Sequence, residues 1–225
     1  MQKIRVKICC ISSIEEAKLA TAYGASALGL VGHMPSGPGV ISNPKISEIT
    51  KSVPPMVSTF LLTSETKAAA VIDHYKKVNT STIQIVDALE NRDYEQIKNK
   101  LPHVKIVQVV HVLNDKSVVE AIGISAYVDA ILLDSGNPNL ETRELGGTGR
   151  THNWDLSRQI RDQIDIPVFL AGGINSNNVK QAIEHVQPFG VDLCSSVRTN
   201  GKLDENKLKL FFQTIQTIHH NQSST

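Results

Sequence analysis

The chain lacks the marks of a membrane or nucleic-acid protein. Its 225 residues hold 23 lysines and arginines against 22 aspartates and glutamates, so no excess of charge favours a nucleic acid or a membrane surface. No apolar run approaches the roughly 18 residues of a spanning helix, and the first residues lead into a strand-like run rather than a signal peptide. We therefore expect a cytoplasmic protein that binds a small molecule, and neither nucleic acid nor membrane.

Cysteine is scarce and follows no disulfide or metal-binding pattern. The three cysteines are Cys9, Cys10 and Cys194, and the first two are adjacent, a spacing at which a disulfide is strained. No HExxH motif and no cluster of cysteine and histidine has the spacing of a zinc site. The sequence therefore predicts three free thiols and no metal.

What the chain does have is a strand-then-helix rhythm that repeats eight times. The apolar runs are nearly continuous, as expected for strands of a parallel sheet that is buried on both faces. They cover residues 4–11, 27–31, 57–62, 82–86, 105–112, 130–133, 167–171 and 190–193. A capping box from Ser13 to Glu16 begins a helix that ends near Gly24, and Asn43-Pro44 begins the next. Further helices are expected at about 64–78, 93–101, 116–123, 154–164, 175–186 and 205–218.

Eight such pairs predict a single (β/α)8 TIM barrel over residues 1–218, followed by a polar tail over residues 219–225. The rival architecture is an open doubly wound sheet, which normally has fewer strands and often a glycine-rich first turn. Here the first turn, residues 9–13, reads Cys-Cys-Ile-Ser-Ser and contains no glycine.

Two candidates for acid–base chemistry stand where apolar runs stop. The active site of a barrel of this kind lies at the carboxyl ends of its strands, so Cys9 and Asp134 can face one substrate although 125 positions separate them. Taken alone, a cysteine in an apolar strand is more often core packing, and a strand-terminal aspartate is often only a turn former. At one rim they are candidates for a general base and a general acid. His111 ends the fifth run and is a further candidate for substrate contact.

The last two strands are followed by loops suited to a phosphate. Gly172 and Gly173 follow the seventh strand, and Ser195 and Ser196 follow the eighth, the two positions that most often form the phosphate site of such a barrel. Glycines let the backbone approach a phosphate, and hydroxyl groups add donors. The long loop after Asp134 contains a glycine-rich segment, residues 146–150, which we interpret as a candidate lid.

These residues carry a family resemblance over nearly the whole chain. The motifs are Lys7-Ile8-Cys9, Leu132-Leu133-Asp134, Gly146-Gly147-Thr148-Gly149-Arg150, Ala171-Gly172-Gly173-Ile174 with Asn178-Val179, and Gly190-Val191-Asp192. The chain resembles phosphoribosylanthranilate isomerase of tryptophan biosynthesis. The resemblance implies a (β/α)8 barrel without a cofactor that performs an Amadori rearrangement on a phosphorylated ribose substrate.

The resemblance also implies roles for individual residues. Cys9 would be the base and Asp134 the acid. The residues expected to bind the phosphate or other parts of the substrate are Gly172, Gly173, Ser195, Ser196, Gly147 and His111.

Several positions depart from the family pattern, among them Ser12, Asp87, Cys194 and Ser196 and the five that follow. Cys10 replaces a glycine, and Gly39 stands where the family has the arginine expected to contact the anthranilate carboxylate. Val86 and His111 replace a histidine and an arginine, and Arg198 replaces an acidic residue. The changes suggest altered recognition of the aromatic acid, and we expect Gly39→Arg to restore the charge and lower the Michaelis constant.

Three hypotheses remain open at this stage. The chain is a phosphoribosylanthranilate isomerase, a barrel isomerase for another ribose-phosphate derivative, or a non-catalytic barrel that binds a phosphorylated metabolite. The presence of both Cys9 and Asp134 argues against the third. A monomer and a homodimer are both compatible with the sequence.

Overall fold

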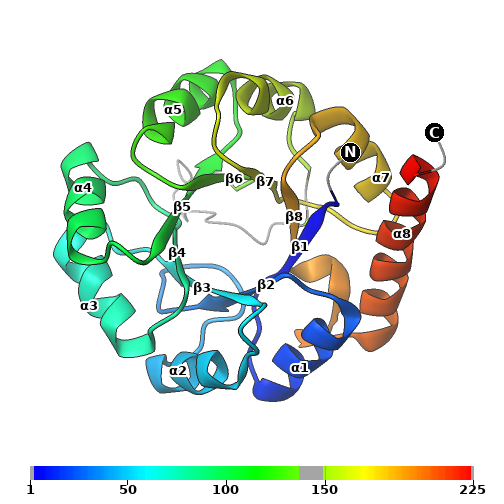
Figure 1. The fold of residues 1–225 in the computed structure, drawn as a ribbon, viewed down its shortest axis with the longest axis horizontal. Helices are drawn as coiled ribbons and strands as arrows, with labels where there is room; N and C mark the ends of the chain where they lie inside the picture. The colour runs from blue at the N-terminus through cyan, green and yellow to red at the C-terminus, as the bar shows by residue number, and fades with distance from the viewer. Residues whose placement is uncertain (1–2, 137–148, 150, 224–225) are drawn as a thin grey trace.

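The chain folds into a closed barrel of eight parallel strands surrounded by helices (Figure 1). The computed structural model describes residues 3–136, 149 and 151–223. Each strand pairs with its neighbours in chain order, and β1 pairs with β8 to close the barrel. The strands are β1 Arg5–Ile8, β2 Ala27–Val31, β3 Ser58–Thr63, β4 Thr82–Ile85, β5 Lys105–His111, β6 Ala130–Asp134, β7 Val168–Leu170 and β8 Gly190–Leu193. The predicted (β/α)8 barrel is confirmed.

The helices follow the strands and pack around them, as Figure 1 shows. They are α1 Ile14–Tyr23, α2 Asn43–Ser52, α3 Ala68–Val78, α4 Asn91–Lys100, α5 Asp115–Ser125, α6 Trp154–Gln163, α7 Val179–Val186 and α8 Glu205–Ser223. Capping explains where several begin. Ser13 accepts a hydrogen bond from the Glu16 amide at the start of α1, and Gly24 ends that helix in the left-handed region, at φ 107°.

Alternation along the strands divides the core into two layers. One layer joins the outer faces of the strands to the helices, and includes Ile8, Leu61 and Ile83. The other fills the barrel itself. Its members are Cys9, Cys10, Ala27, Val31, Phe60, Leu62, Val86, Val107, Val109, Ala130, Leu132, Phe169 and Ala171. Lys7 and Asp192 are also buried, so the sequence places a charged pair as well as apolar side chains in the interior.

Element boundaries differ from expectation at a few places. β1 ends at Ile8 rather than at residue 11, because Cys10 adopts a left-handed backbone, at φ 62°, that no strand can contain. α7 begins at Val179 rather than at 175, and α8 runs to Ser223 rather than ending at 218. The glycine-rich segment expected to act as a lid lies outside the described residues, except for Gly149.

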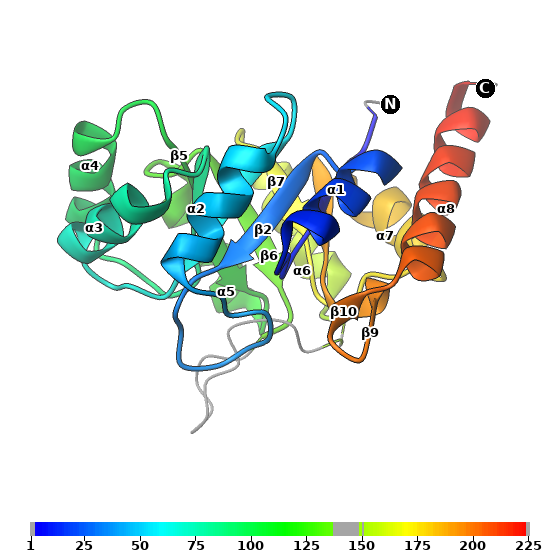
Figure 2. The same cartoon turned by 90° about the horizontal axis from the view of Figure 1, so that it is seen from below.

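A short hairpin follows the last barrel strand. A single 3-10 turn, η1 Ser195–Val197, leads into β9 Arg198–Thr199 and β10 Lys202–Leu203, which pair antiparallel. Figure 2 shows the hairpin at the end of the barrel toward which the β2 arrow points. This is the carboxyl-terminal rim of the strands, where a barrel of this class builds its site.

Candidate active site

A cavity opens at the carboxyl-terminal rim of the barrel. Its volume is about 720 Å³ including the open mouth. Six of the predicted site residues line it together: Cys9, Asp134, Gly172, Gly173, Ser195 and Ser196. The fold therefore brings together groups from four strands that the sequence separates widely.

Cys9 lies in the cavity wall just after β1. Its amide donates to the Leu193 carbonyl at 2.7 Å, which ties it to the end of β8. The side chain is only 6% exposed. A hydrogen bond from Cys10 lowers the pKa of the Cys9 thiol, and the Lys7 ammonium adds to this effect against the opposing influence of burial. The site therefore favours a Cys9 thiolate, the form that a general base requires.

A buried ion pair lies beneath Cys9. The Lys7 Nζ donates to Asp192 Oδ2 at 2.8 Å, and both side chains are nearly inaccessible. Burial alone would lower the pKa of Lys7, but Asp192 and the neighbouring thiols raise it, so the ammonium stays charged. A methyl group built on Gly29 would meet both Cys9 Sγ at 2.8 Å and Lys7 Nζ at 3.1 Å. Only glycine at this position leaves room for the thiol and the ammonium side by side.

Lys7 was not among the catalytic and binding residues predicted from the sequence. A signal was available, because Lys7 lies two residues before Cys9 and side chains two apart share one face of a strand. A lysine on the interior face needs a buried partner, and that partner stands 185 positions away in β8.

Asp134 closes β6 and lines the cavity. Its carboxyl group is 7% exposed, and its Oδ1 accepts from the Ser135 amide at 2.8 Å. Burial raises the pKa of Asp134, against the opposing effects of that hydrogen bond and of Lys7. The environment therefore favours a protonated carboxyl group, which can donate a proton.

His111 pairs in register with Asp134 at the end of β5. It is buried, and neither ring nitrogen has a hydrogen-bond partner among the described residues. Burial lowers its pKa, so the ring is neutral near pH 7. His111 is not among the residues that line the cavity, so the geometry does not support it as a replacement for a substrate-binding arginine.

The Gly172-Gly173 turn forms the cavity wall after β7. Both glycines have positive φ, at 75° and 65°. A methyl group on Gly172 would meet the Ser135 Oγ at 2.7 Å. The side chains of Asn175 and Asn178 both donate to the Gly173 carbonyl, at 3.0 and 2.9 Å, and so fix the turn. The turn is rigid, and no larger residue can replace Gly172 without displacing its neighbours.

Ser195 and Ser196 form the adjoining wall after β8. The Ser196 Oγ is buried and has no hydrogen-bond partner within the described part of the chain. A methyl group on Gly149 would lie 3.6 Å from the Ser195 Oγ, so the described end of the glycine-rich loop reaches this wall. Gly147, the predicted residue of that loop, lies outside the described residues. A buried hydroxyl group beside a turn of two glycines, Gly172 and Gly173, that lines the cavity suits an anionic ligand.

The segment after β2 lines a further part of the cavity through Met34, Ser36, Gly37 and Pro38, and Gly39 packs against Cys10. Gly39 has φ 80°, and a methyl group on it would lie 2.5 Å from the Cys10 Cβ. An arginine cannot occupy this position while Cys10 is present. Our expectation that Gly39→Arg alone restores binding is therefore wrong, because a side chain at position 39 meets Cys10 and because φ 80° strains any residue other than glycine there.

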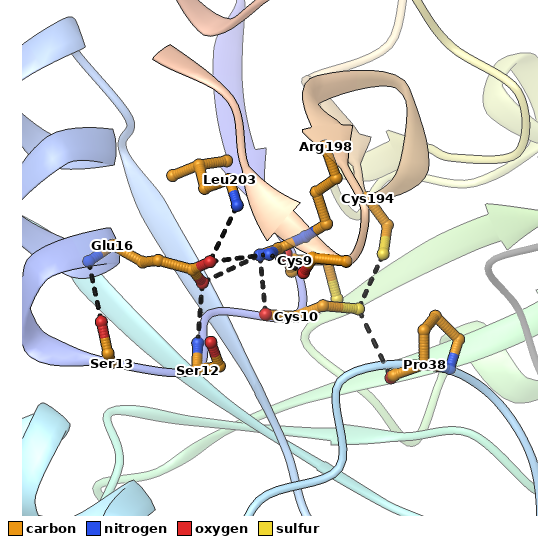
Figure 3. Close-up of polar contacts among 10 residues, drawn as sticks. Cys9, Cys10, Ser12, Ser13, Glu16, Pro38, Cys194, Arg198 and Leu203 are labelled. Atoms are coloured by element: carbon orange, nitrogen blue, oxygen red, sulfur yellow. Dashed lines mark hydrogen bonds and ion pairs between the residues drawn. The ribbon is translucent and has the colours of Figure 1, made fainter.

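Arg198 is not part of the cavity wall, and it holds in place the loop that follows β1. Its guanidinium donates to the carbonyls of Cys9 and Cys10 and forms an ion pair with Glu16 at 2.9 Å (Figure 3). The Glu16 carboxylate also accepts from the amides of Ser12 and Leu203. Arg198 therefore positions the loop that carries Cys9, and its departure from the family pattern does not bear on the aromatic acid.

No group of three or more histidine, cysteine or carboxylate side chains suited to a metal ion occurs among residues 3–136, 149 and 151–223. Within the same part of the chain, no helix has both the length and the apolar character that crossing a membrane requires.

Comparison with known proteins gives one consistent result. The sequence pattern of the N-(5'phosphoribosyl)anthranilate isomerase family matches residues 6–214. N-(5'-phosphoribosyl)anthranilate isomerase 1 of Methanosarcina mazei is 31% identical over 227 residues, covering 95% of each chain. The crystal structure of phosphoribosyl anthranilate isomerase from Thermotoga maritima is 28% identical with a TM-score of 0.82, covering 95% of this chain and 99% of that one. A second isomerase structure, in complex with reduced 1-(o-carboxyphenylamino)-1-deoxyribulose 5-phosphate, has a TM-score of 0.79 at 26% identity and the same coverage.

Proposed function

Because the chain belongs to the N-(5'-phosphoribosyl)anthranilate isomerase family and is an isomerase, we propose that Cys9 and Asp134 carry out its reaction. The reaction is the Amadori rearrangement of N-(5'-phosphoribosyl)anthranilate to 1-(2-carboxyphenylamino)-1-deoxyribulose 5-phosphate. The observation that carries the proposal is one cavity with a thiol whose pKa is lowered and a carboxyl group whose pKa is raised. Pairs of titrating groups whose environments push their pKa values apart are typical of acid–base sites.

Asp134 acts first, as the general acid. Its carboxyl group protonates the furanose ring oxygen, the C1–O bond breaks, and the anthranilate nitrogen forms a Schiff base with C1. A buried carboxyl group is suited to this step because burial disfavours its ionised form.

Cys9 acts next, as the general base. Its thiolate takes the proton from C2, and the resulting enolamine tautomerises to the ketone. Lys7 supports this step as a positioning residue, because its ammonium favours the thiolate without reaching the rim itself. Each proton transfer of this kind contributes about 100-fold to 10,000-fold in rate.

The phosphate group binds at the wall formed by the Gly172-Gly173 turn and the Ser195-Ser196 turn. Support comes from the buried Ser196 Oγ, which has no hydrogen-bond partner among the described residues, and from the glycine turn beside it, which two asparagine side chains hold. Binding there orients the sugar so that C1 and C2 face Asp134 and Cys9.

One observation favours a second candidate substrate, another amino-sugar phosphate. The described residues of the cavity wall include no lysine or arginine, and Gly39 cannot be exchanged for one while Cys10 is present. A carboxylate in the substrate lacks a charged partner in this part of the wall, and such a partner contributes about 1.5–3 kcal/mol.

The test is turnover of freshly generated phosphoribosylanthranilate, followed by the loss of its fluorescence. Wild-type protein is expected to turn it over, and Cys9→Ser and Asp134→Asn are each expected to lose about 100-fold or more. Circular dichroism of each variant serves as the control for folding. A wild-type protein that neither turns over this substrate nor rescues a strain lacking the isomerase would overturn the proposal. Turnover of a different ribose-phosphate derivative would support the second candidate.

We also propose a cytoplasmic location, because three free thiols are typical of a reducing compartment. The choice between monomer and homodimer stays a prediction to be tested by sedimentation.

A further inference from the structure

Two thiols to which the proposed mechanism gives no proton transfer meet at the cavity rim. Cys10 follows β1 and Cys194 follows β8, and their sulfur atoms lie 2.7 Å apart although 184 positions separate them (Figure 3). Both side chains line the cavity. Cys10 Sγ also lies 3.6 Å from the Pro38 carbonyl, so its position is fixed from a third segment.

We propose that Cys10 and Cys194 are a redox modification site, at which a small-molecule disulfide of the oxidised-glutathione class converts the two thiols to a reversible disulfide that switches the isomerase off. The formation of the link stands on the thiol geometry alone. Its effect on turnover rests on the function proposed above.

The geometry selects this pair among the three cysteines. A disulfide has a sulfur–sulfur distance of about 2.05 Å, so the two atoms need to approach by less than about 1 Å. Cys9 and Cys10 are adjacent, and a bridge between them is strained. The pair also joins two different loops, so the link is long-range in the chain.

The exposure and the hydrogen bonds of the two cysteines indicate the order in which they react with the disulfide reagent. Cys194 is partly exposed whereas Cys10 is buried, so an incoming disulfide reaches Cys194 first. Hydrogen bonds to Cys194 and then to Cys9 raise the pKa of the Cys10 thiol, so Cys10 is not the first to react, and its position 2.7 Å from the Cys194 sulfur places it for the second, resolving step.

The chemistry is balanced. The Cys194 thiolate attacks one sulfur of the reagent, forms a mixed disulfide and releases one glutathione thiolate. The Cys10 thiolate then attacks the Cys194 sulfur, forms the internal disulfide and releases the second glutathione. The protein loses two protons and two electrons, and the reagent is reduced to two thiols.

The disulfide acts on both functional walls of the cavity. It removes the Cys10 thiol, whose hydrogen bond is the largest influence lowering the pKa of Cys9, while Lys7 and Asp192 still face Cys9. It also pulls on Cys194, the residue before Ser195, and so displaces the wall that we propose binds the phosphate. A displacement of about 1 Å can lower turnover by up to about 100-fold.

The experiment treats the purified full chain with oxidised glutathione, and then with dithiothreitol. Peptide mapping without reduction is expected to find Cys10 joined to Cys194 with Cys9 free. Turnover is expected to fall roughly tenfold or more and to return after reduction. Cys194→Ser is the matched variant, and its ratio of turnover after and before treatment is expected to stay near one.

Each other outcome contradicts a different part of the account. Three thiols that remain free, or modification found on Cys9, would overturn the assignment of the site. A Cys10–Cys194 disulfide without a change in turnover would overturn the switch. A disulfide that forms in a protein without isomerase activity would leave the site in place and instead contradict the proposed function.

Discussion

The two sides of the cavity differ in how their residues relate to one another. On the side built by β1, β6, β7 and β8, local hydrogen bonds hold Asp134 through the Ser135 amide and Gly173 through two asparagine side chains. On the side formed by the segment after β2, Gly39 packs against Cys10, and Cys10 also lowers the pKa of Cys9. A change on the second side can therefore leave Asp134 and the Gly172-Gly173 turn in place, but a change at Cys10 alters the catalytic thiol.

The largest effect is expected when the buried pair beneath Cys9 is broken. Lys7→Met leaves the Asp192 carboxylate buried without its partner, which costs about 3–5 kcal/mol in the free energy of unfolding. The measurement is urea denaturation. Adding Asp192→Asn to the same chain removes the stranded charge and is expected to recover part of the stability. If Lys7→Met and the wild type had equal free energies of unfolding, the Lys7–Asp192 pair would not stabilise this side of the cavity.

A smaller effect is expected from crowding the catalytic thiol. Gly29→Ala places a methyl group 2.8 Å from Cys9 Sγ and 3.1 Å from Lys7 Nζ, so turnover is expected to fall roughly tenfold or more. Gly123→Ala is the matched control, because a methyl group there meets nothing within 4 Å. It lies in α5, where alanine is favoured over glycine by about 1 kcal/mol. A loss of turnover in both variants alike would contradict the close packing around Cys9.

The other side of the cavity should show coupling between two positions. Gly39→Arg alone is expected to raise the Michaelis constant or to destabilise the fold, because its Cβ meets Cys10. Cys10→Gly removes the contacts at 2.5 and 3.0 Å that the Cys10 Cβ and Sγ make with this Cβ, whereas the Cys10 Cα stays at 3.0 Å and φ 80° still strains the arginine. The Michaelis constant of the double variant for phosphoribosylanthranilate is therefore expected to fall below that of Gly39→Arg alone. The double-mutant cycle measures the coupling. Additive effects of the two changes would contradict the contact between positions 10 and 39.

The elements that sequence predicted best are those set by local pattern. Continuous apolar runs located all eight strands, and the Ser13 capping box located the start of α1. The residues whose roles the sequence did not predict depend on contacts between distant segments of the chain. Lys7 needs Asp192 to be stable inside the barrel, and Arg198 finds its role only through Glu16 and the carbonyls of the first loop. The incompatibility of position 39 with arginine likewise arises from the folded chain, through the contact with Cys10 and the positive φ of Gly39.

The pH dependence of kcat/KM in wild type and in Asp134→Asn tests the central claim most directly. Cys9 must lose a proton to act as the base, so the rate rises with pH through its lowered pKa. Asp134 must keep a proton to act as the acid, so the rate falls as pH rises through its raised pKa. The account predicts a bell-shaped profile for wild type, and a low profile without the falling limb for Asp134→Asn. A falling limb that stays unchanged in the variant would contradict the role of Asp134 as the general acid.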